Sequence, residues 1–241
     1  MSSRPFQPKA MCSLLVEAMR TGAYARSCHL PPETELSLSL GISRTQLRDV
    51  LAILEQEGFI TRRHGVGTVI NRHVVNVPVR MDIETEFLEM IRKSGFESGV
   101  AYVRAEAGQA DEDQAQSLGL SPGDPVFTVT RLCTADGRPA IYCQDVLPQT
   151  LVGQDVPLSE LEKPIFSYLE EQCGVYAYMD LTDLRPVCAD ETLAEIFAVP
   201  VGSPLLKMRE VDYDIAGNPI LHSIQYFADG IFHHTVLRKK L

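Results

Sequence analysis

No stretch of the 241-residue sequence approaches the roughly 18–20 consecutive apolar residues that a membrane-spanning helix needs. The first nine residues contain neither the apolar core nor the cleavage signal of a secretory leader. The six cysteines form no CxxC pair, and no cysteine and histidine set has zinc spacing. We therefore expect a cytoplasmic protein with no membrane segment, metal or cofactor, whose cysteines serve as small apolar side chains in a reducing compartment.

Catalytic signatures are also missing. The sequence has no nucleophile elbow, no P-loop and no HExxH motif. These absences favour a protein that binds rather than an enzyme.

The net charge of −10 argues against nucleic-acid binding when the chain is taken whole, but the charge is unevenly divided. Residues 1–73 hold nine Lys and Arg against six Asp and Glu, whereas the remainder holds 13 against 26. Electrostatic attraction acts over a Debye length of roughly 8–10 Å. A basic N-terminal part is therefore able to bind DNA while the acidic part stays away from it.

The basic part has the pattern of a helix-turn-helix. Apolar spacing predicts a helix over residues 9–21 and a second one from Pro32 to about residue 40, followed by a turn at Gly41. Ser43 is a suitable N-cap for a third helix over residues 44–57. The inward positions of that helix are Leu47, Val50, Leu51 and Leu54. Two helices joined by a short glycine turn form the DNA-reading unit of many regulators.

The first turns of the third helix carry the candidate base-reading residues Arg44, Thr45 and Arg48, on or near the face opposite the apolar stripe. In a helix-turn-helix the second helix of the pair enters the major groove with its N-terminal residues at base edges. A guanidinium group there can donate two hydrogen bonds to guanine.

A β-hairpin is predicted next, with strands at residues 59–63 and 68–70 around the glycine-rich turn at 64–67. Its candidate DNA contacts are Arg62, Arg63, His64 and Gly65. The alternative is that the two arginines form only a solvated strand face. Because the hairpin directly follows a helix-turn-helix, the reading as a DNA-binding wing is favoured, with a glycine that lets the backbone approach DNA closely.

These residues resemble the GntR superfamily of bacterial regulators. The matching runs are LPPETEL at 30–36, LGISRT at 40–45, LEQEGFI at 54–60 and RHGVGT at 63–68. The resemblance implies that Arg44, Thr45 and Arg48 contact an operator and that His64 and Gly65 lie at the wing tip. One departure is Thr34, where the family usually has an arginine.

We interpret residues 1–72 as the DNA-binding domain, 73–81 as a linker and 82–241 as a second domain that opens with a helix over 82–92. The second domain contains a repeat, since Ala-Asp-Glu at 110–112 recurs at 189–191 and is followed by matching glycines and prolines. Each copy predicts a helix and two hairpin strands, at 126–132 and 139–146 and again at 205–213 and 219–228. Such hairpins build an antiparallel sheet with helices covering one face, and a cleft between the copies is a natural ligand site.

This half looks like the UTRA effector-binding domain of the HutC-type branch of that superfamily. The resembling segments are LGL at 118–120 with GDP at 123–125, Arg131 with ADGRP at 135–139, FSYLE at 166–170, YD at 213–214 with GNP at 217–219, SIQYF at 223–227 and LRK at 237–239. The resemblance implies a sensor domain that shares its fold with chorismate lyase. The expected fold class is α+β: an N-terminal winged helix-turn-helix plus a C-terminal antiparallel-sheet UTRA domain.

Arg131 is the leading candidate for effector binding. It lies in mid-strand in an apolar run, where an arginine is costly unless it is paired. A ligand carboxylate or phosphate would satisfy it, and the alternative is an ion pair with a neighbouring acid. Further candidates are Ser223, Tyr226, Tyr142, Asp145 and Ser98, each of which has an ordinary structural role as its alternative.

Two further departures concern the ligand. Relatives that bind amino-sugar phosphates tend to have a small hydroxyl residue where this chain has Pro164 and an acid where it has Leu221. We therefore expect a different effector, a small anion. His222, His233 and His234 are expected as exposed polar residues rather than metal ligands, because adjacent residues on a strand point to opposite faces.

The leading hypothesis is a transcription repressor that binds a palindromic operator as a homodimer and is controlled by a small-molecule effector. One alternative is an enzyme on the chorismate lyase-like fold, which turnover of a chorismate-like substrate would reveal. A third is a nucleoid-type DNA binder with a purely structural second domain, which would show no change of melting temperature with any metabolite.

Overall fold

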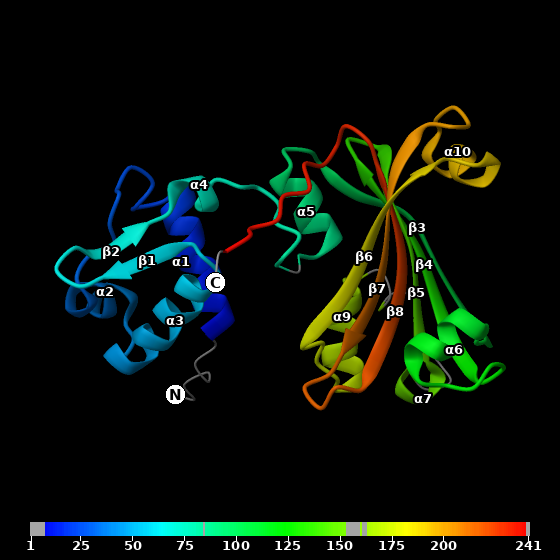
Figure 1. Ribbon diagram of the computed structural model, residues 1–241, viewed down its shortest axis with the longest axis horizontal. Helices are drawn as coiled ribbons and strands as arrows, with labels where there is room; N and C mark the ends of the chain where they lie inside the picture. The colour runs from blue at the N-terminus through cyan, green and yellow to red at the C-terminus, as the bar shows by residue number, and fades with distance from the viewer. Residues whose placement is uncertain (1–7, 84, 153–159, 161–162, 240–241) are drawn as a thin grey trace. The chain divides into compact units, whose positions relative to one another are not determined.

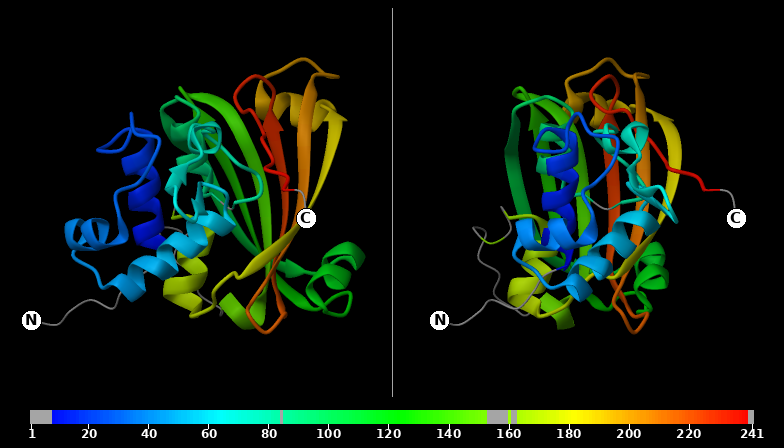
Figure 2. Two further views of the ribbon diagram at one scale, coloured as in Figure 1. Left: turned by 60° about the vertical axis from the view of Figure 1, so that its left-hand side comes forward. Right: turned by 90° about the vertical axis from the view of Figure 1, so that its left-hand side faces the viewer.

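A computed structural model describes residues 8–83, 85–152, 160 and 163–239 (Figures 1 and 2). The chain divides into two compact units, residues 1–83 together with 235–241, and residues 84–234. Each unit has its own hydrophobic core. Among the helices of the described residues, none has the length and apolar character to cross a bilayer.

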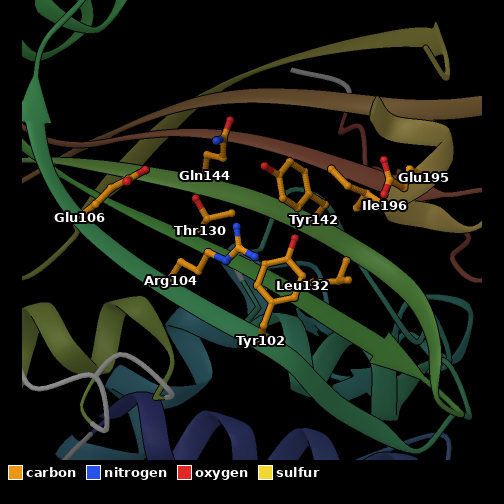
Figure 3. A pocket seen from close by; sticks show the side chains of 9 residues that line it. All are labelled: Tyr102, Arg104, Glu106, Thr130, Leu132, Tyr142, Gln144, Glu195 and Ile196. Atoms are coloured by element: carbon orange, nitrogen blue, oxygen red, sulfur yellow. The ribbon is translucent and has the colours of Figure 1, made fainter. Parts of the chain in front are cut away.

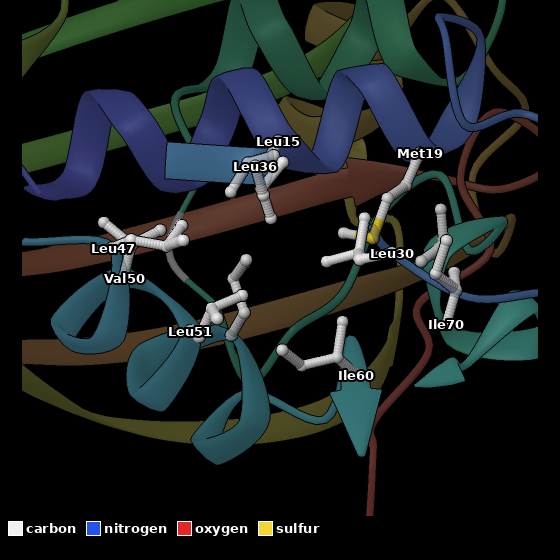
Figure 4. Packing of buried hydrophobic residues seen from close by; sticks show 11 residues of the cluster. Leu15, Met19, Leu30, Leu36, Leu47, Val50, Leu51, Ile60 and Ile70 are labelled. Carbon is white, nitrogen blue, oxygen red and sulfur yellow. The ribbon is translucent and has the colours of Figure 1, made fainter. Parts of the chain in front are cut away.

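The first unit contains a helix-turn-helix followed by a hairpin, as predicted. Its elements are α1 (Pro8–Arg20), α2 (Glu33–Leu40), α3 (Arg44–Gln56), β1 (Ile60–Arg63), β2 (Gly67–Ile70) and α4 (Arg72–Val75). One apolar cluster joins them, and Figure 4 shows Leu15 and Met19 of α1 facing Leu47 and Leu51 of α3. Because the apolar positions of each helix face this cluster, the polar faces of α2 and α3 remain at the surface.

Residues 73–81, the expected linker, lie within the first unit. Val75 and Val79 are buried, and residues 72–75 form a helical turn. Arg20 donates to the backbone carbonyls of Val75 and Val77 at 3.0 and 3.1 Å, and Arg72 donates to the carbonyl of Ser27 at 3.1 Å. These two arginines therefore fasten the segment to α1 and the loop after it.

As far as its residues are described, the second unit is built around one antiparallel sheet of six strands. Its elements are α5 (Phe87–Lys93), β3 (Ser98–Gln109), α6 (Glu112–Leu118), β4 (Pro125–Ala135), β5 (Arg138–Pro148), α7 (Gln149–Val152), α9 (Ile165–Tyr168), the π-helical turn η1 (Leu169–Cys173), β6 (Met179–Cys188), α10 (Glu191–Phe197), β7 (Pro204–Tyr213) and β8 (Pro219–Ala228). The strand order is β3-β4-β5-β8-β7-β6.

The predicted repeat is present in three dimensions. Each copy is a strand, a helix and two further strands, β3-α6-β4-β5 and β6-α10-β7-β8, and the copies meet where β5 pairs with β8. Asp111 and Asp190 cap α6 and α10 in the same way, each accepting from a backbone N–H three residues on at 2.8 Å. The sequence repeat missed the first strand of each copy, because β3 and β6 are edge strands with largely exposed side chains.

Helices cover both faces of the sheet, and the expectation of one covered face is wrong. In Figure 1, α6 and α10 lie on one side of the sheet, whereas α5 and α9 lie on the other. The α6 helix packs on Val126 and Val146, while α9 packs on Phe127 and Leu147. Side chains of both alternating sets of β4 are therefore buried, which fits its many apolar and β-branched residues.

Candidate DNA-binding and effector sites

The first turn of α3 presents polar side chains to solvent from a helix whose apolar side is buried. Arg44, Thr45 and Arg48 are exposed, while the four predicted inward residues of α3 are buried. The start of the helix is held by a capping box. The hydroxyl of Ser43 accepts from the N–H of Gln46 at 3.2 Å, and the Gln46 side chain accepts from the N–H of Ser43 at 3.0 Å.

Arg48 already has an acidic neighbour. Its Nε donates to Oε2 of Glu33, in the first turn of α2, at 2.9 Å. The Arg48 side chain nevertheless keeps 60% of its surface exposed. An exposed ion pair of this kind contributes little to stability, so the guanidinium group can exchange partners readily.

The wing is a two-stranded hairpin whose tip is open. Arg63 pairs with Gly67 across the hairpin, and Gly65 between them has φ +76° with no atom within 4 Å of the position of a Cβ. The exposed residues around this tip are Arg62, Arg63 and His64. Glycine adopts this left-handed backbone without strain, which leaves the tip narrow and its backbone accessible.

Contacts with α3 and with residues 28–30 fix the wing. The carboxylate of Glu55 in α3 accepts from the N–H and from Nε of Arg62, both at 2.7 Å. The hydrogen bond from the Arg62 backbone, reinforced by the guanidinium charge, lowers the pKa of Glu55. On the other side, Leu30 donates to the carbonyl of Thr68 and Ile70 donates to that of Cys28. Arg62 is thus partly engaged in holding the wing to the helix.

In the second unit, the structure brings Arg131, Asp145 and Ser223 together on one face of the sheet. Arg131 in β4 pairs with Cys143, and Asp145, two residues further along β5, pairs with Ser223 in β8. Arg131 is only 4% exposed and donates to the carbonyl of Lys163 at 2.7 Å. The Ser223 hydroxyl donates to Asp145 at 2.7 Å. Burial raises the pKa of Asp145, against the Ser223 hydrogen bond and the charge of Arg131, which both lower it.

Three polar side chains that are not among the residues predicted from the sequence adjoin this set. Gln225 donates to the Ser223 hydroxyl at 3.2 Å and to the carboxyl group of Glu210 at 3.3 Å. Burial raises the pKa of Glu210 to about 7, helped by the charges of Asp180 and Asp145. Burial likewise raises the pKa of Glu86 to about 7, although the charge of Arg131 opposes it. Strand alternation from Ser223 would have placed Gln225 on this face, but no sequence signal pointed to Glu86.

We call these six residues, Glu86, Arg131, Asp145, Glu210, Ser223 and Gln225, the polar cluster. It combines one guanidinium group with three carboxyl groups and two neutral hydrogen-bonding side chains. Such a set is suited to a ligand that carries both an anionic group and hydrogen-bond donors.

Tyr142 and Tyr226 lie on the opposite face of the sheet, so the predicted effector residues do not form one site. Their rings stack at 6.3 Å and pack beside α10. Tyr142 also lines a cavity of about 530 Å³, which Figure 3 shows with Arg104 next to Thr130 and Tyr102. Strand alternation explains the separation, since Tyr142 precedes Cys143 by one residue and its side chain therefore points away from the polar cluster.

Ser98 is also outside the polar cluster. It begins β3 and accepts from Arg92 of α5 at 2.9 Å. The β3 partner of Arg131 is Val103, five residues further along, or roughly 16 Å at the rise of a strand.

The expectation of exposed histidines is wrong for His222. Its side chain is 2% exposed and lies 3.8 Å from Asp113 of α6, because residue 222 faces the sheet side that α6 covers. Burial lowers the pKa of His222. His234 is half-buried, with its ring 5.1 Å from that of Phe227. In the described part of the chain, no group of three or more His, Cys, Asp or Glu residues is placed to hold a metal ion.

Comparisons with known proteins agree with this architecture. Residues 11–70 match the family described as bacterial regulatory proteins, gntR family, and residues 93–232 match the UTRA domain. The chain is 24% identical over 217 residues to a Rhizobium meliloti (strain 1021) protein named as the uncharacterized HTH-type transcriptional regulator RB1450, covering 88% of this chain and 86% of that one. It is 23% identical over 205 residues to the HTH-type transcriptional repressor NagR of Bacillus subtilis (strain 168), covering 85% and 83%.

A solved structure extends the likeness to the fold. The possible transcriptional regulator YydK from Bacillus subtilis superimposes with a TM-score of 0.74 at 17% identity, covering 96% of this chain and 99% of that one. The predicted combination of a GntR-type winged helix-turn-helix with a UTRA domain is therefore confirmed. The chain belongs to the GntR family of bacterial regulatory proteins, as a DNA-binding transcriptional regulator of the HutC type with a C-terminal UTRA domain.

Proposed function

We propose that this protein is a repressor that binds a palindromic operator as a homodimer and that a small metabolite bound in the UTRA domain controls this binding. The proposal that α3 reads DNA rests on one observation: the first turn of α3 is exposed and capped, and the open wing lies in the same unit. The named repressor NagR, a relative over most of the chain, supports the choice of repression. The work of such a protein takes place in the cytoplasm, where the DNA is.

In this proposal α3 enters the major groove. Arg44 and Arg48 read base edges and Thr45 contacts bases or the adjacent phosphates. Arg63, His64 and Gly65 of the wing approach the DNA backbone, with Arg62 shared between Glu55 and a phosphate. Two copies related by a two-fold axis would read half-sites one helical turn apart, roughly 34–36 Å, or a multiple of it.

For the effector we propose the polar cluster as the binding site, with Arg131 meeting an anionic group. Asp145 and Ser223 form a hydrogen-bonded pair beside it that accepts donors from the ligand. Tyr142, Tyr226 and Ser98 are left out because they lie elsewhere in the unit. An effector with a carboxylate or phosphate and also hydroxyl or amino groups satisfies both the guanidinium and the carboxyl groups, which a bare anion does not.

The UTRA domain acts here by binding and not by catalysis. The polar cluster offers hydrogen bonds and charge, and the proposal gives none of its groups a bond-breaking role. Turnover of a chorismate-like substrate by the purified protein would contradict this part of the proposal.

Two measurements test the function. Operator sequences are first selected from random duplexes with the purified full-length protein, and a palindromic consensus is the expected result. A thermal-shift screen with a metabolite panel then looks for a ligand that stabilises the protein and also changes operator binding. If the protein enriches no sequence, the proposal of a DNA-binding repressor is wrong. If it binds an operator but no metabolite changes its stability or its operator binding, only the proposal of metabolite control is wrong.

Two matched variants, each of which removes one arginine from the sheet, test where the effector binds. Arg131→Gln removes the guanidinium from the polar cluster, and Arg104→Gln removes one from the opposite face of the same sheet. We expect Arg131→Gln to abolish the ligand-induced shift while Arg104→Gln retains it. The reverse result would move the effector site to the cavity of Figure 3.

A further inference from the structure

The C-terminal residues 235–239 pack in the first compact unit, although they follow the whole UTRA domain in sequence. The two family matches end at residue 70 and at residue 232, so they assign no role to this segment or to residues 71–92. The two unassigned stretches contact each other. Arg80 and Thr235 form a parallel bridge, and Met81 donates to the carbonyl of Thr235 at 2.9 Å.

Arg80 and Asp82 connect this bridge to the end of α3. Arg80 is 6% exposed, donates to the carbonyl of Glu57 at 2.6 Å and lies 5.1 Å over the ring of Phe59. Its guanidinium also pairs with Asp82, which in turn accepts from the N–H of Leu237 at 3.2 Å. The residues just after α3 are therefore held by a buried guanidinium that the C-terminal segment helps to orient.

The segment also contacts the end of α3 directly. Lys239 Nζ donates to the carbonyl of Glu55 at 3.1 Å and to that of Gln56. The last carbonyls of a helix lack intrahelical partners and carry partial negative charge, which a lysine satisfies well. Leu237 packs on Gly58, since a Cβ at that glycine would lie 2.6 Å from Leu237 Cδ2.

We propose that residues 235–239 are a positioning element of the DNA-binding unit, with Leu237 and Lys239 holding the C-terminal end of the recognition helix α3. The inference rests on the proposed DNA-reading role of α3. The same segment is a second covalent connection to the UTRA domain, because only six residues lie between Thr235 and the end of β8. The strand that carries Ser223 and Gln225 thus continues, within at most about 25 Å of extended chain, into the residues that hold α3.

The test uses the full-length protein with an operator selected by the wild type, and a scrambled duplex of equal length. Leu237→Ala and Lys239→Gln remove the two contacts. Val236→Ala and Arg238→Gln are the matched controls, since Val236 is 51% exposed and Arg238 is an exposed cation one residue from Lys239. Affinity is measured by fluorescence anisotropy, and amide hydrogen exchange is followed over residues 52–60.

We expect the two test variants to weaken operator binding by about threefold or more and to speed exchange over residues 52–60, while both controls stay close to wild type. Binding to the scrambled duplex should fall equally for Lys239→Gln and Arg238→Gln, because each loses one positive charge. Lys239→Arg, which keeps a cation with donors, should retain operator affinity. If Lys239 acted through its charge alone, Arg238→Gln would weaken operator binding as much as Lys239→Gln does.

Two outcomes separate this inference from the proposed function. If the wild type binds operator selectively and the test variants match their controls in affinity and in exchange, the segment does not position α3. If the wild type binds no sequence selectively, the proposed function itself fails. The helix-end exchange rates still report whether the segment holds α3 in that case.

Discussion

At the scale of single residues, one of the arginines proposed to read bases already pairs with a carboxylate. The carboxylate of Glu33 accepts from Nε of Arg48 at 2.9 Å. Glu33 directly precedes Thr34, the position at which the family usually has an arginine. A carboxylate at position 33 would repel phosphate and compete for the guanidinium group that is proposed to read a base. We therefore expect operator binding to be weaker than the exposed arginines alone would give.

Glu33→Gln should tighten operator binding by about two- to fivefold, because it frees Arg48 and removes one negative charge near the DNA. Glu35→Gln is the control, since it removes the same charge from the same helix without touching Arg48. Anisotropy titrations of the selected operator measure both. Equal gains from the two variants would assign the effect to net charge and would contradict a specific role for the ion pair.

Glu210 is a residue whose protonation links stability to pH. Its pKa is about 7 in the folded protein against the usual 4.5, so the folded state binds more protons between these values and stability falls as pH rises from about 4.5 to 7. Glu210→Gln should remove part of this decline and stabilise the protein at pH 8 by roughly 1–3 kcal/mol. Chemical denaturation at pH 5 and pH 8 checks it. A wild-type stability that rises through this window, or a variant less stable than wild type at pH 8, would contradict the assignment.

At the scale of elements, the position of α3 depends on both of its ends. The capping box of Ser43 and Gln46 fixes the start, where the proposed base-reading residues lie. Glu55 fixes the relation to the wing through Arg62, and the end is followed by Gly58 with φ +78°. A substitution that destabilises the N-terminal turn of α3 should therefore weaken DNA binding more than a substitution elsewhere that destabilises the protein equally.

Ser43→Ala should cost about 1 kcal/mol of stability and weaken operator binding, because the first turn of α3 frays without its cap. Ser39→Ala removes a hydroxyl from α2 that bonds only to the preceding turn, and a surface change of this kind costs within about 0.5 kcal/mol. Urea denaturation and anisotropy measure the two effects. Normal operator affinity for Ser43→Ala would show that the cap does not order the reading surface.

The elements of the DNA-binding unit were predictable because local rules determine them. Ser43 caps a helix, Gly41 ends one, and apolar spacing sets the buried side of α3. The edge strands β3 and β6 escaped prediction because an edge exposes much of its side-chain surface and loses the alternation that marks a strand. The helix expected over 82–92 begins only at Phe87, and the expected linker became part of a folded unit through Arg20 and Arg72, contacts that no local pattern reveals.

The residues of the proposed effector site were also only partly predictable, because tertiary contacts bring them together. Arg131 is a candidate because it lies in an apolar strand, and Ser223 and Asp145 are candidates because they offer hydrogen-bonding groups on neighbouring hairpin strands. The register of β4, β5 and β8 brings the three together. Tyr142 and Tyr226 are candidates for their hydroxyl groups but lie on the other face of the sheet, because the strand register decides the face and the sequence does not supply that register. Glu86 joins the polar cluster from the segment before α5, and only the tertiary fold reveals it.

At the scale of the whole molecule, an acidic protein of net charge −10 binds DNA through a basic N-terminal part. In the proposed homodimer, two such parts share one operator, so affinity should depend steeply on salt and on half-site spacing. Inserting five base pairs between the half-sites of a selected operator should reduce binding by about tenfold or more, because one reading surface then faces the wrong side of the duplex. Gel shifts with the two duplexes measure it, and unchanged affinity would contradict simultaneous engagement by two copies.

The proposed function depends most on base reading by Arg44 on the exposed first turn of α3. The direct measurement is an anisotropy titration of wild type and Arg44→Ala against the selected operator and a scrambled duplex at several salt concentrations. If Arg44 reads a base, Arg44→Ala should lose about 1–3 kcal/mol of binding free energy on the operator and far less on the scrambled duplex. An equal loss on both duplexes would show that Arg44 contributes only charge, and wild-type affinity on the operator would contradict the claim outright.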